Sequence, residues 1–548
     1  MSPEPGADFE EADPLRAAAR ERPDAVALED GRGRLSWQEL DEEVEALALG
    51  LAGAGVEPGD RVACLLPVGR EAVLALHAGP RVGASLAPLH PGWTEAELDA
   101  YLRRIRPRAL LCGAATEERA EASLRASGLL VRLGPTTAGG DAAAGDDATA
   151  GSAGAVPAGD LPAADGLPGV DPEAEHTLMA TSGTSGHPRG VRLSLANHRA
   201  CQRAAARRLD LGPEDRWLAT LSPAHVGGVA LVLRAAFTGA RLVLRGGFDP
   251  EAFLALAEEG RISHASLVPT MLRRLLDARA PDAAPEALRG LLVGGDAADP
   301  SLLTEALERG WPVCPTYGLT EAASQVATAT PAEVGGHPTS VGRPLDGVEV
   351  RIEGEEILVR GPTVGLGYLG SERAPGAVVR GGRVIPRQGE EAPEAEGGPD
   401  EEAAAGPVRG EPLVDGDGWL RTGDAGRLDD AGRLHVTGRL SGRIVTGGVT
   451  VDPVEVERVL RGHPEIRDVC VVGVPDEEWG ERVSAAVERD PGAPEADPDD
   501  PLTRAELALW FGDRLAPAKR PRQVRFVDEL PRTPEGKPDR DALRRWLG

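Results

Sequence analysis

The sequence predicts an α/β protein with a large N-terminal domain of parallel or mixed sheets covered by helices, and a small α+β domain at the C-terminus. Two patterns lead to this prediction. Short apolar runs alternate with helix-like stretches over most of the chain. After Arg439 the pattern changes to that of a compact segment with its own expected helices and strands. The length of 548 residues leaves room for both domains and a sizeable core. We therefore divide the chain into residues 1–438 and 439–548.

The alternation of the first domain begins near residue 61 and returns after residue 216. Strand-helix-strand alternation is typical of parallel strands joined by crossover helices. The expected strands and helices of the first domain are 61–66, 71–81, 84–89, a helix after Thr94, 217–221, 226–237, 240–244, 262–268, 288–293 and 313–317. Those of the second domain are a helix at 454–460, a strand at 466–474, a helix at 504–515 and a strand at 523–527.

Two segments interrupt these patterns. Residues 134–171 consist mainly of Gly, Ala, Asp and Pro, and residues 388–407 are acidic. Neither contains the large apolar side chains that a packed core requires. We expect both to be disordered or loosely attached insertions without chemistry of their own.

Charge and cysteine content exclude several classes of protein. The chain has 60 basic and 88 acidic residues, a formal net charge of -28 that repels nucleic acid and anionic membranes. No apolar run approaches the roughly 18 residues of a membrane span, and the acidic N-terminus does not resemble a signal peptide. Its five cysteines are scattered, which favours buried thiols over disulfides or zinc. We expect a cytoplasmic protein.

Lysine is almost absent, since only Lys519 and Lys537 occur among the 60 basic residues. A GC-rich genome alone could cause this replacement by arginine. The acidic excess and the aromatic content of 3% also suit a cytosol rich in salt, where screening tolerates self-repulsion. A halophilic origin therefore stands as a hypothesis beside the genomic one.

The most informative stretch is T-S-G-T-S-G-H-P-R-G-V at residues 181–191. Glycines let consecutive N–H groups converge on an anion, and hydroxyls and Arg189 add donors for phosphate oxygens. The stretch is not a Walker loop, and a flexible Ser/Gly hairpin is the structural alternative. The candidate phosphate-binding residues are Thr181, Ser182, Gly183, Thr184, Ser185, Gly186 and Arg189.

Three further stretches add candidate nucleotide contacts. Gly294, Gly295 and Asp296 follow an apolar run, where an open parallel sheet binds ligands. Residues 317–321 offer an aromatic face for a base, a hydroxyl for phosphate and a carboxylate for Mg²⁺. Asp424 could accept both hydroxyls of a ribose. Taken singly, Tyr317 could instead be core filler, Glu321 an exposed helix start and Asp424 a turn residue.

Together and in this order, the motifs resemble those of the adenylate-forming superfamily, which includes acyl-CoA synthetases, peptide-synthetase adenylation domains and luciferases. The resemblance covers nearly the whole chain. It includes residues 35–40, 59–62, 340–344, 361–362, 367–369, 423–424, 438–439 and 530–537.

The resemblance implies a set of ligands and roles. The ligands are ATP, Mg²⁺ and CoA. Residues 181–190 would hold the ATP phosphates, with Thr184 and Arg189 catalytic. The remaining nucleotide contacts would be Gly294, Gly295, Asp296, Tyr317 and Gly318 at the adenine, Thr320 and Glu321 at phosphate and Mg²⁺, and Asp424 and Arg439 at the ribose.

The C-terminal domain would be mobile, because the resemblance gives it different tasks in two half-reactions. Lys537 would contact the attacking carboxylate and the bridging oxygen in the first. A lysine suits this role as a compact cation. Gly447 and Gly448 would face the CoA pantetheine in the second.

Three positions depart from the superfamily pattern. Arg189 stands where lysine is usual, which keeps the charge but alters the donor geometry. Gly442 falls where many members have an acidic hinge residue, and residues 447–453 lack the usual Asn/Tyr-containing version. A glycine can still absorb large backbone rotations, so Gly442 stays the candidate hinge.

Within the superfamily, the sequence motifs are similar to those of the o-succinylbenzoate:CoA ligases of menaquinone synthesis. The similarity rests on residues 221–228, 268–272, 315–318 and 322–328. A dicarboxylate leaves one carboxylate unreacted, and burying it requires a cation or several donors. The candidate substrate contacts are His225, Arg234, Ser324 and Gln325, although Arg234 could equally be a surface residue at the far end of its helix.

The sequence therefore predicts an ATP-dependent acid:CoA ligase that converts a carboxylate to an acyl-adenylate and then to an acyl-CoA. A medium-chain or aryl acid:CoA ligase is the alternative among enzymes. A carrier-loading or non-catalytic adenylate-binding module is the alternative outside them. The expected partners are a small carboxylate, ATP and CoA, with no nucleic acid and no membrane span. The sequence leaves open whether the protein forms a homo-oligomer.

The net charge of -28 leads to a test of the halophile hypothesis. If self-repulsion limits stability, the thermal midpoint should rise from about 0.1 M KCl, where the Debye length is about 10 Å, to above roughly 1 M. Scanning calorimetry across this series measures the midpoint. A flat or falling midpoint would leave only the genomic explanation.

Overall fold

The computed structural model describes residues 12–123, 130–133, 166–181, 189–279, 282–369, 378–380, 383–385, 413–446, 449–476, 479–489, 506–507, 509–512, 514–533 and 537–548. They form two compact units. The first comprises Met1–Gly295, Ser301–Val350 and Val359–Arg421, and the second Asp296–Pro300, Arg351–Leu358 and Thr422–Gly548. These units do not coincide in detail with the domains expected from the sequence, and the boundary at 438/439 stays a prediction.

The first unit contains a nine-stranded sheet with the order β15-β14-β13-β12-β11-β9-β10-β1-β2. The strands from β13 to β1 pair in parallel, and β2, β14 and β15 are antiparallel additions at the two ends. Their bounds are β1 (Val26–Asp30), β2 (Gly33–Ser36), β9 (Arg216–Ala219), β10 (Arg241–Leu244), β11 (His264–Leu267), β12 (Gly290–Val293), β13 (Val313–Leu319), β14 (Ser324–Thr328) and β15 (Arg343–Pro344).

A seven-stranded sheet with the order β18-β8-β7-β4-β3-β5-β6 accompanies it. Here β7 to β6 pair in parallel, whereas β8 is antiparallel to both β7 and β18. The strands are β3 (Arg61–Leu65), β4 (Ser85–Pro88), β5 (Ala109–Gly113), β6 (Leu130–Leu133), β7 (Glu175–Thr181), β8 (Arg189–Ser194) and β18 (Gly367–Tyr368). The predicted α/β class with parallel and mixed sheets is confirmed.

Helices of the first unit begin where the sequence offers capping side chains. Ser36 and Glu39 form a capping box at α2, and Thr94 and Glu97 form one at α4, directly after the threonine from which this helix was predicted. The helices are α1 (Pro14–Glu21), α2 (Trp37–Gly53), α3 (Arg70–Arg81), α4 (Glu95–Ile105), α5 (Glu117–Ala122), α6 (Leu195–Leu209), α7 (Val226–Thr238), α8 (Pro250–Glu258), α9 (Pro269–Ala278), α10 (Pro300–Glu308) and α11 (Pro331–Val334).

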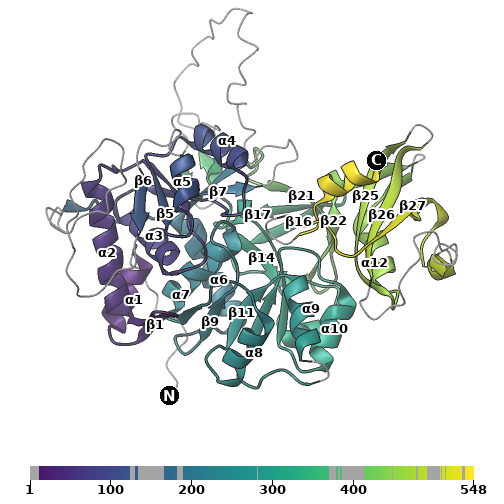
Figure 1. Cartoon of the computed structure of the whole chain (residues 1–548), viewed down its shortest axis with the longest axis horizontal. Helices are drawn as coiled ribbons and strands as arrows, with labels where there is room; N and C mark the ends of the chain where they lie inside the picture. The colour runs from purple at the N-terminus through teal and green to yellow at the C-terminus, as the bar shows by residue number, and fades with distance from the viewer. Residues whose placement is uncertain are drawn as a thin grey trace, which may run out of the picture. The chain divides into compact units, whose positions relative to one another are not determined.

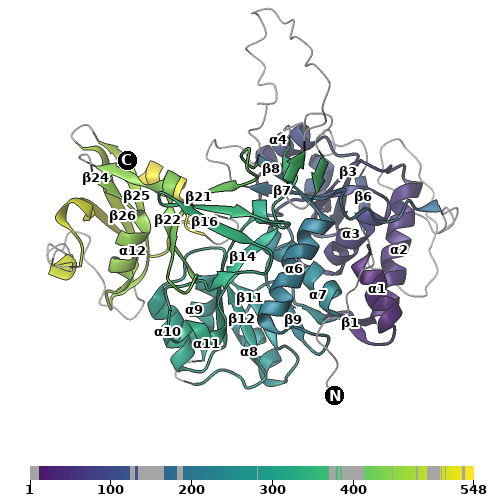
Figure 2. The ribbon, with the colours of Figure 1, turned by 180° about the vertical axis from the view of Figure 1, so that it is seen from behind.

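One buried core joins the two sheets of this unit. It contains Leu28 and Leu242 from the nine-stranded sheet, Val62 and Leu86 from the seven-stranded sheet, and Leu233 from α7. Helices α6 and α7 lie side by side, as both views of the ribbon show (Figures 1 and 2). These two helices carry Gln202 and Arg234, which are described below, and both helices contact β14 of the nine-stranded sheet.

The second unit contains a four-stranded sheet, β16-β17-β21-β22, and a five-stranded sheet, β24-β23-β26-β25 with β27 beside β26. The sequence analysis missed β26, the strand on which the other strands of the second sheet depend. The bounds are β16 (Glu349–Glu353), β17 (Glu356–Arg360), β21 (Leu420–Leu428), β22 (Leu434–Arg439), β23 (Ile444–Thr446), β24 (Val449–Val451), α12 (Pro453–Arg461), β25 (Ile466–Asp476), β26 (Gly480–Arg489), β27 (Gln523–Val527) and α14 (Arg540–Leu547). A short hairpin of the first unit joins β19 (Val378–Arg380) to β20 (Arg383–Ile385).

The two expected insertions fall largely outside the described residues, which exclude 134–165 and all of 388–407. Residues 166–171 are described, and there Leu167 and Val170 pack against the core. The expectation of a loosely attached segment is therefore wrong for these last residues, because two apolar side chains anchor them.

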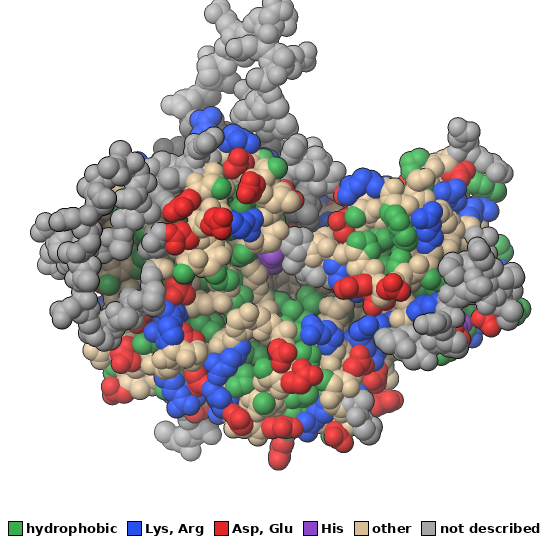
Figure 3. Space-filling model, viewed as in Figure 1, with side chains coloured by type: hydrophobic (Ala, Val, Ile, Leu, Met, Phe, Trp, Pro, Cys, Tyr) green, Lys and Arg blue, Asp and Glu red, His purple; other side chains and the backbone are tan. Residues whose placement is uncertain are grey.

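All five cysteines are buried and none forms a disulfide, as predicted. Burial raises the pKa of Cys314 to about 12. Among the described residues, no helix is both long and apolar enough to cross a membrane. On the face shown in Figure 3, acidic and basic side chains are interspersed, so the acidic excess does not form a single patch there.

A buried ion-pair cluster ties α1, α2 and α3 together. Arg81 is 2% exposed and donates to Asp13 Oδ2 at 2.7 Å, to Glu45 Oε2 at 3.1 Å and to Asp41. Burial alone would raise the pKa of Asp13, but the charge and hydrogen bond of Arg81 hold it below its usual value. The guanidinium thus compensates several carboxylates at once.

Replacing Arg81 by Met should destabilise the fold by about 3–5 kcal/mol, because the buried carboxylates lose their counter-charge. Urea unfolding followed by circular dichroism measures this loss. Arg207→Met is the control, since Arg207 forms an ion pair with Asp346 in which both side chains are more than half exposed. It should cost less than about 1 kcal/mol. Equal losses in the two variants would contradict a structural role for the cluster.

Candidate active site

The predicted phosphate-binding stretch joins two antiparallel strands. Thr181 ends β7 and pairs with Arg189, the first residue of β8. Ser182, Gly183, Thr184, Ser185 and Gly186 lie outside the described residues. The connection runs from strand to strand, whereas a Walker loop runs from strand to helix, so the exclusion of a Walker loop is supported.

A tight turn follows β13 and carries several predicted site residues. It consists of the 3₁₀ helix η3 (Thr320–Ala322) between β13 and β14. A Cβ at Gly318 would lie 1.7 Å from the carbonyl oxygen of Ser324, so only glycine fits there. Ser324 has a φ of 111°, which is uncommon for a residue other than glycine. Such strained backbone often accompanies functional sites.

Glu321 lies in this turn and contacts β18. The hydroxyl of Tyr368 donates to Glu321 Oε1 at 2.9 Å, and the guanidinium of Arg189 lies 5.5 Å from the centre of the Tyr368 ring. Burial and the neighbouring carboxylate raise the pKa of Tyr368. The structure therefore brings together two predicted residues, Glu321 and Arg189, through a tyrosine to which the sequence analysis gave no role.

The surroundings of Glu321 fit a magnesium ion shared with a nucleotide. Within the described part of the chain, no three His, Cys, Asp or Glu side chains gather into a metal-binding cluster. Mg²⁺ in nucleotide sites usually takes one or two carboxylates, and phosphates and water complete its shell. Glu321 could be such a carboxylate.

The adenine candidates lie at the carboxyl ends of neighbouring parallel strands. Gly294 and Gly295 follow β12, and Tyr317 and Gly318 lie near the end of β13. A Cβ at Gly294 would lie 2.6 Å from Thr316 Cγ2, so the close approach of β13 requires glycine. Tyr317 is 8% exposed, which leaves its alternative role as core filler open. Asp296 is the first residue of the second unit and caps the N–H of the next residue.

The two predicted ribose contacts meet on neighbouring strands of the second unit. Asp424 on β21 is paired with Arg439 on β22, and Arg439 Nε lies 2.9 Å from Asp424 Oδ1. The carboxylate is 5% exposed, whereas the arginine side chain is 64% exposed. Asp424 is thus a buried hydrogen-bond acceptor, and Arg439 is a solvent-exposed donor beside it.

The remaining second-unit candidates lie on connecting segments. Lys537 is exposed, and its carbonyl oxygen accepts from the backbone N–H of Thr533 at 2.7 Å. Gly442 ends the 3₁₀ turn η4 (Leu440–Gly442), where a Cβ would meet only Arg439 Cβ at 3.8 Å. The fold therefore leaves room for a Cβ at position 442. Gly447 and Gly448, between β23 and β24, lie outside the described residues.

Arg234 on α7 is the best-defined substrate candidate. It is 2% exposed, so the alternative of a surface residue is wrong. Its Nε donates to Gln202 Oε1 at 2.9 Å, its Nη2 donates to Gln325 Oε1, and its guanidinium lies 4.9 Å from the Trp217 ring centre. The structure thus brings together Arg234 and Gln325, which the sequence analysis had assigned to one pocket.

Within the described residues, no carboxylate balances the charge on Arg234. No Asp or Glu there forms an ion pair with it, and its Nη1 has no hydrogen-bond partner. Burial lowers its pKa to about 10, so the side chain is still a cation at neutral pH. A buried unpaired cation is costly, and such groups mark functional sites.

The other two substrate candidates are not joined to Arg234 by any contact among the described residues. His225 lies at the N-terminus of α7, with its ring 5.5 Å from that of His90. Ser324 is half-buried at the start of β14. The sequence analysis missed Gln202 and Trp217. One feature of the sequence could have identified Gln202. It is a polar amide side chain on the same helix face as the buried residues Leu195, Cys201 and Ala205 of α6.

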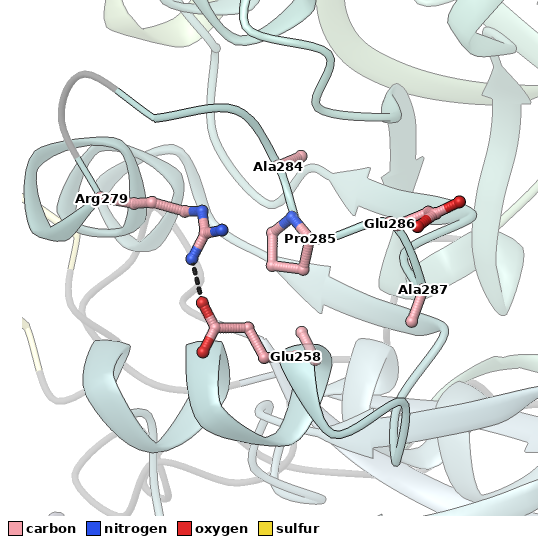
Figure 4. Close-up of a pocket in the computed structure, with 7 residues that line it drawn as sticks. Glu258, Arg279, Ala284, Pro285, Glu286 and Ala287 are labelled. Carbon is pink, nitrogen blue, oxygen red and sulfur yellow. Dashed lines mark hydrogen bonds and ion pairs between the residues drawn. The ribbon is translucent and has the colours of Figure 1, made fainter.

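A separate hollow lies between the end of α8 and the segment 284–287, and contains none of the predicted site residues. Figure 4 shows Arg279 pointing across it to Glu258, with which it forms an ion pair. That pair is internally neutralised, and the other charged side chain that lines the hollow, Glu286, is acidic.

The fold, the nucleotide candidates at the sheet edge and the buried cation together define an adenylate-forming enzyme. The chain belongs to the AMP-binding enzyme family. The pattern of this family matches residues 15–369, and that of the AMP-binding enzyme C-terminal domain matches residues 455–537.

The similarity to several relatives extends over nearly the whole chain. A 2-succinylbenzoate–CoA ligase of Geobacillus kaustophilus is 32% identical, covering 97% of each protein, and that of Bacillus licheniformis is 32% identical over 96% of this chain and 98% of the relative. Among solved structures, o-succinylbenzoate CoA synthetase of Bacillus subtilis with its acyl-adenylate intermediate is 27% identical with a TM-score of 0.76, covering 97% and 98%. An amide bond synthetase of Marinactinospora thermotolerans is 30% identical with a TM-score of 0.77, covering 98% and 99%.

The contact between Tyr368 and Glu321 leads to a prediction. Tyr368→Phe removes the donor that orients the carboxylate, and should lower the rate of adenylate formation roughly tenfold, the value of one charge-assisted hydrogen bond. ATP-pyrophosphate exchange measured over a series of Mg²⁺ concentrations tests this.

Tyr101→Phe is the matched control, because the buried Tyr101 hydroxyl has no hydrogen-bond partner among the described residues. It should leave the exchange rate unchanged. If Tyr368→Phe behaves like the control, Tyr368 does not orient Glu321 for the reaction.

Proposed function

We propose that the protein is an AMP-forming o-succinylbenzoate:CoA ligase that uses ATP, Mg²⁺ and CoA. Full-length similarity to 2-succinylbenzoate–CoA ligases supports the reaction class. The single observation that carries the substrate assignment is the buried cation of Arg234, which lacks a carboxylate partner among the described residues.

Activation is the first half-reaction. The substrate carboxylate attacks the α-phosphorus of ATP, the bond to the bridging oxygen breaks, and pyrophosphate leaves. Arg189 and residues 181–186 bind the phosphates, with Thr184 among the hydroxyl donors. Lys537 balances the charge that builds up around the phosphorus. When bound, Mg²⁺ supplies further charge neutralisation, and Thr320 and Glu321 would hold it against the phosphates.

The nucleoside is bound by the remaining candidates. Gly294, Gly295 and Asp296 lie beside the adenine with Tyr317 and Gly318, since glycine backbone permits close approach. Asp424 accepts the ribose hydroxyls, and its low exposure keeps the carboxylate in one orientation. Arg439 donates beside it.

Thioester formation is the second half-reaction. The CoA thiol attacks the acyl carbon, and AMP leaves with the electron pair of the acyl-phosphate bond. Gly447 and Gly448 line the path of the pantetheine, and Gly442 is the hinge about which the C-terminal segment moves between the two steps. We place the enzyme in the cytoplasm, with small molecules as its partners.

Arg234 favours o-succinylbenzoate over other acids. This substrate has two carboxylates, of which one reacts and the other stays charged. A benzoate or a medium-chain fatty acid has no second anion, so Arg234 would be left buried and uncompensated. Arginine matches a carboxylate in shape as well as in charge.

The acid specificity can be tested with a substrate panel. We expect kcat/KM for o-succinylbenzoate to exceed that for benzoate or octanoate by roughly two or more orders of magnitude, because analogues leave buried donors unpaired. Pyrophosphate exchange and CoA-thioester formation are both measured, with a simple amine as an alternative acceptor. Equal activation of octanoate would contradict the substrate but not the ligase, and amide formation in place of thioester would contradict the acceptor.

The role of Lys537 can be tested separately in the two half-reactions. Lys537→Ala should reduce adenylate formation by roughly a hundredfold, the scale of one lost transition-state contact, while thioester formation from pre-made acyl-adenylate survives. Lys519→Ala is the control. Lys519 is the only other lysine of the sequence, and its Nζ donates to Glu455 Oε1 and Oε2 at 2.7 and 2.6 Å. It should keep both activities. Equal loss of both half-reactions in Lys537→Ala would refute the assignment.

A further inference from the structure

The side chains around Arg234 are neutral. Gln202 and Gln325 bind its guanidinium through amide oxygens, and the Trp217 ring contacts it through its face. Cys201, on the same helix as Gln202, is a buried thiol whose pKa is raised by burial. The arginine is therefore fixed in place by groups that accept hydrogen bonds without cancelling its charge.

The more distant neighbours keep this arrangement neutral and fixed. Gln325 Nε2 donates to Thr328 Oγ1 at 2.8 Å, which leaves the amide oxygen for Arg234. The ring of Trp217 stacks on that of His264 at 4.9 Å. Burial lowers the pKa of His264 to about 4 against the opposing charge of Asp215, so the imidazole is uncharged near neutral pH.

Three buried donors in this cluster have no partner among the described residues. They are Nη1 of Arg234, Nε2 of Gln202 and Nε1 of Trp217, on side chains that are 2%, 0% and 0% exposed. Arg234 and Gln202 are joined by the bond from Arg234 Nε to Gln202 Oε1. Buried donors are rarely left unsatisfied, so this cluster favours an acceptor from outside the described protein, such as a ligand oxygen or a water.

We propose that Gln202 is a specificity-determining residue, which positions Arg234 for the unreacted carboxylate of the substrate. Its neutral amide oxygen holds the guanidinium by Nε, so the positive charge and the Nη1 donors stay available to an external anion. This inference rests on the proposed function, because it requires an acid with a second carboxylate. A glutamate at position 202 would fill the same space but supply an internal counter-anion.

The test is Gln202→Glu, compared on two acids. One is o-succinylbenzoate, and the other is 4-oxo-4-phenylbutanoate, which has the same reacting chain but no ring carboxylate. The ratio of their kcat/KM values should fall at least tenfold in the variant, mainly through a higher KM for o-succinylbenzoate, because the internal carboxylate competes for Arg234. Thermal unfolding separates this effect from damage, since pairing a buried cation should raise the midpoint.

Matched variants complete the design. Gln38→Glu makes the same charge change on an exposed glutamine of α2, and should leave the ratio unchanged. Gln202→Met removes the anchoring oxygen without adding charge, and should lower the ratio a few fold even if the glutamate variant does not fold. In an Arg234→Met background, adding Gln202→Glu should change the ratio no further, because its effect acts through Arg234.

The outcomes separate the inference from the proposed function. If the unmodified protein does not discriminate between the two acids, the proposed function fails and the inference falls with it. If it discriminates and Gln202→Glu and Gln202→Met retain the ratio, the inference is overturned and the function stands. Equal loss of activity on both acids with a lower thermal midpoint would show a merely structural role and would also overturn the inference.

Discussion

Parallel pairing of β12 with β13 is the constraint on which the candidate site of the first unit depends. The pairing brings Gly294, after β12, against Thr316 on β13, and leaves no space for a Cβ. The chain then turns back through η3 into β14, with Gly318 packed against the carbonyl oxygen of Ser324. Glu321 is held in this turn, and Gln325 is carried on the returning strand. One strand pair and one tight turn thus hold two candidate site residues, Glu321 and Gln325, close together in the chain.

Among the described residues, the two most deeply buried arginines show how similar side chains serve different purposes. Arg81 and Arg234 are each 2% exposed. Arg81 is surrounded by Asp13, Asp41 and Glu45, so its charge is used within the fold. Arg234 is surrounded by neutral groups, so its charge is available to a ligand. Burial alone would not separate the two, whereas the charge of the neighbours does.

Stability and specificity are therefore in opposition at Arg234. A carboxylate from the protein would compensate the cation and stabilise the fold, but under the proposed function it would also occupy the donors that a dicarboxylate substrate needs. Functional sites commonly retain such a conflict between a local rule of packing and the requirement to bind a ligand. The neutral amides of Gln202 and Gln325 are a compromise, because they orient the guanidinium and leave its charge uncancelled.

The sequence by itself determined the α/β class, seven strands of the first unit (β3, β4 and β9 to β13), three of its helices (α3, α4 and α7), and the residues grouped around β13 and β14. Apolar periodicity and short motifs are local properties, so they can be read without the fold. Capping residues such as Thr94 also marked where helices begin. It did not determine β26, which forms a hairpin with the preceding strand β25 and whose small residues Ser484, Ala485 and Ala486 weaken its apolar pattern. Nor did it determine the burial of Arg234, which depends on α6, α7 and β14 packing together. It likewise gave no role to Gln202, Trp217 and Tyr368. Only the tertiary structure decided these, because a contact between distant segments leaves no periodic signal in either of them.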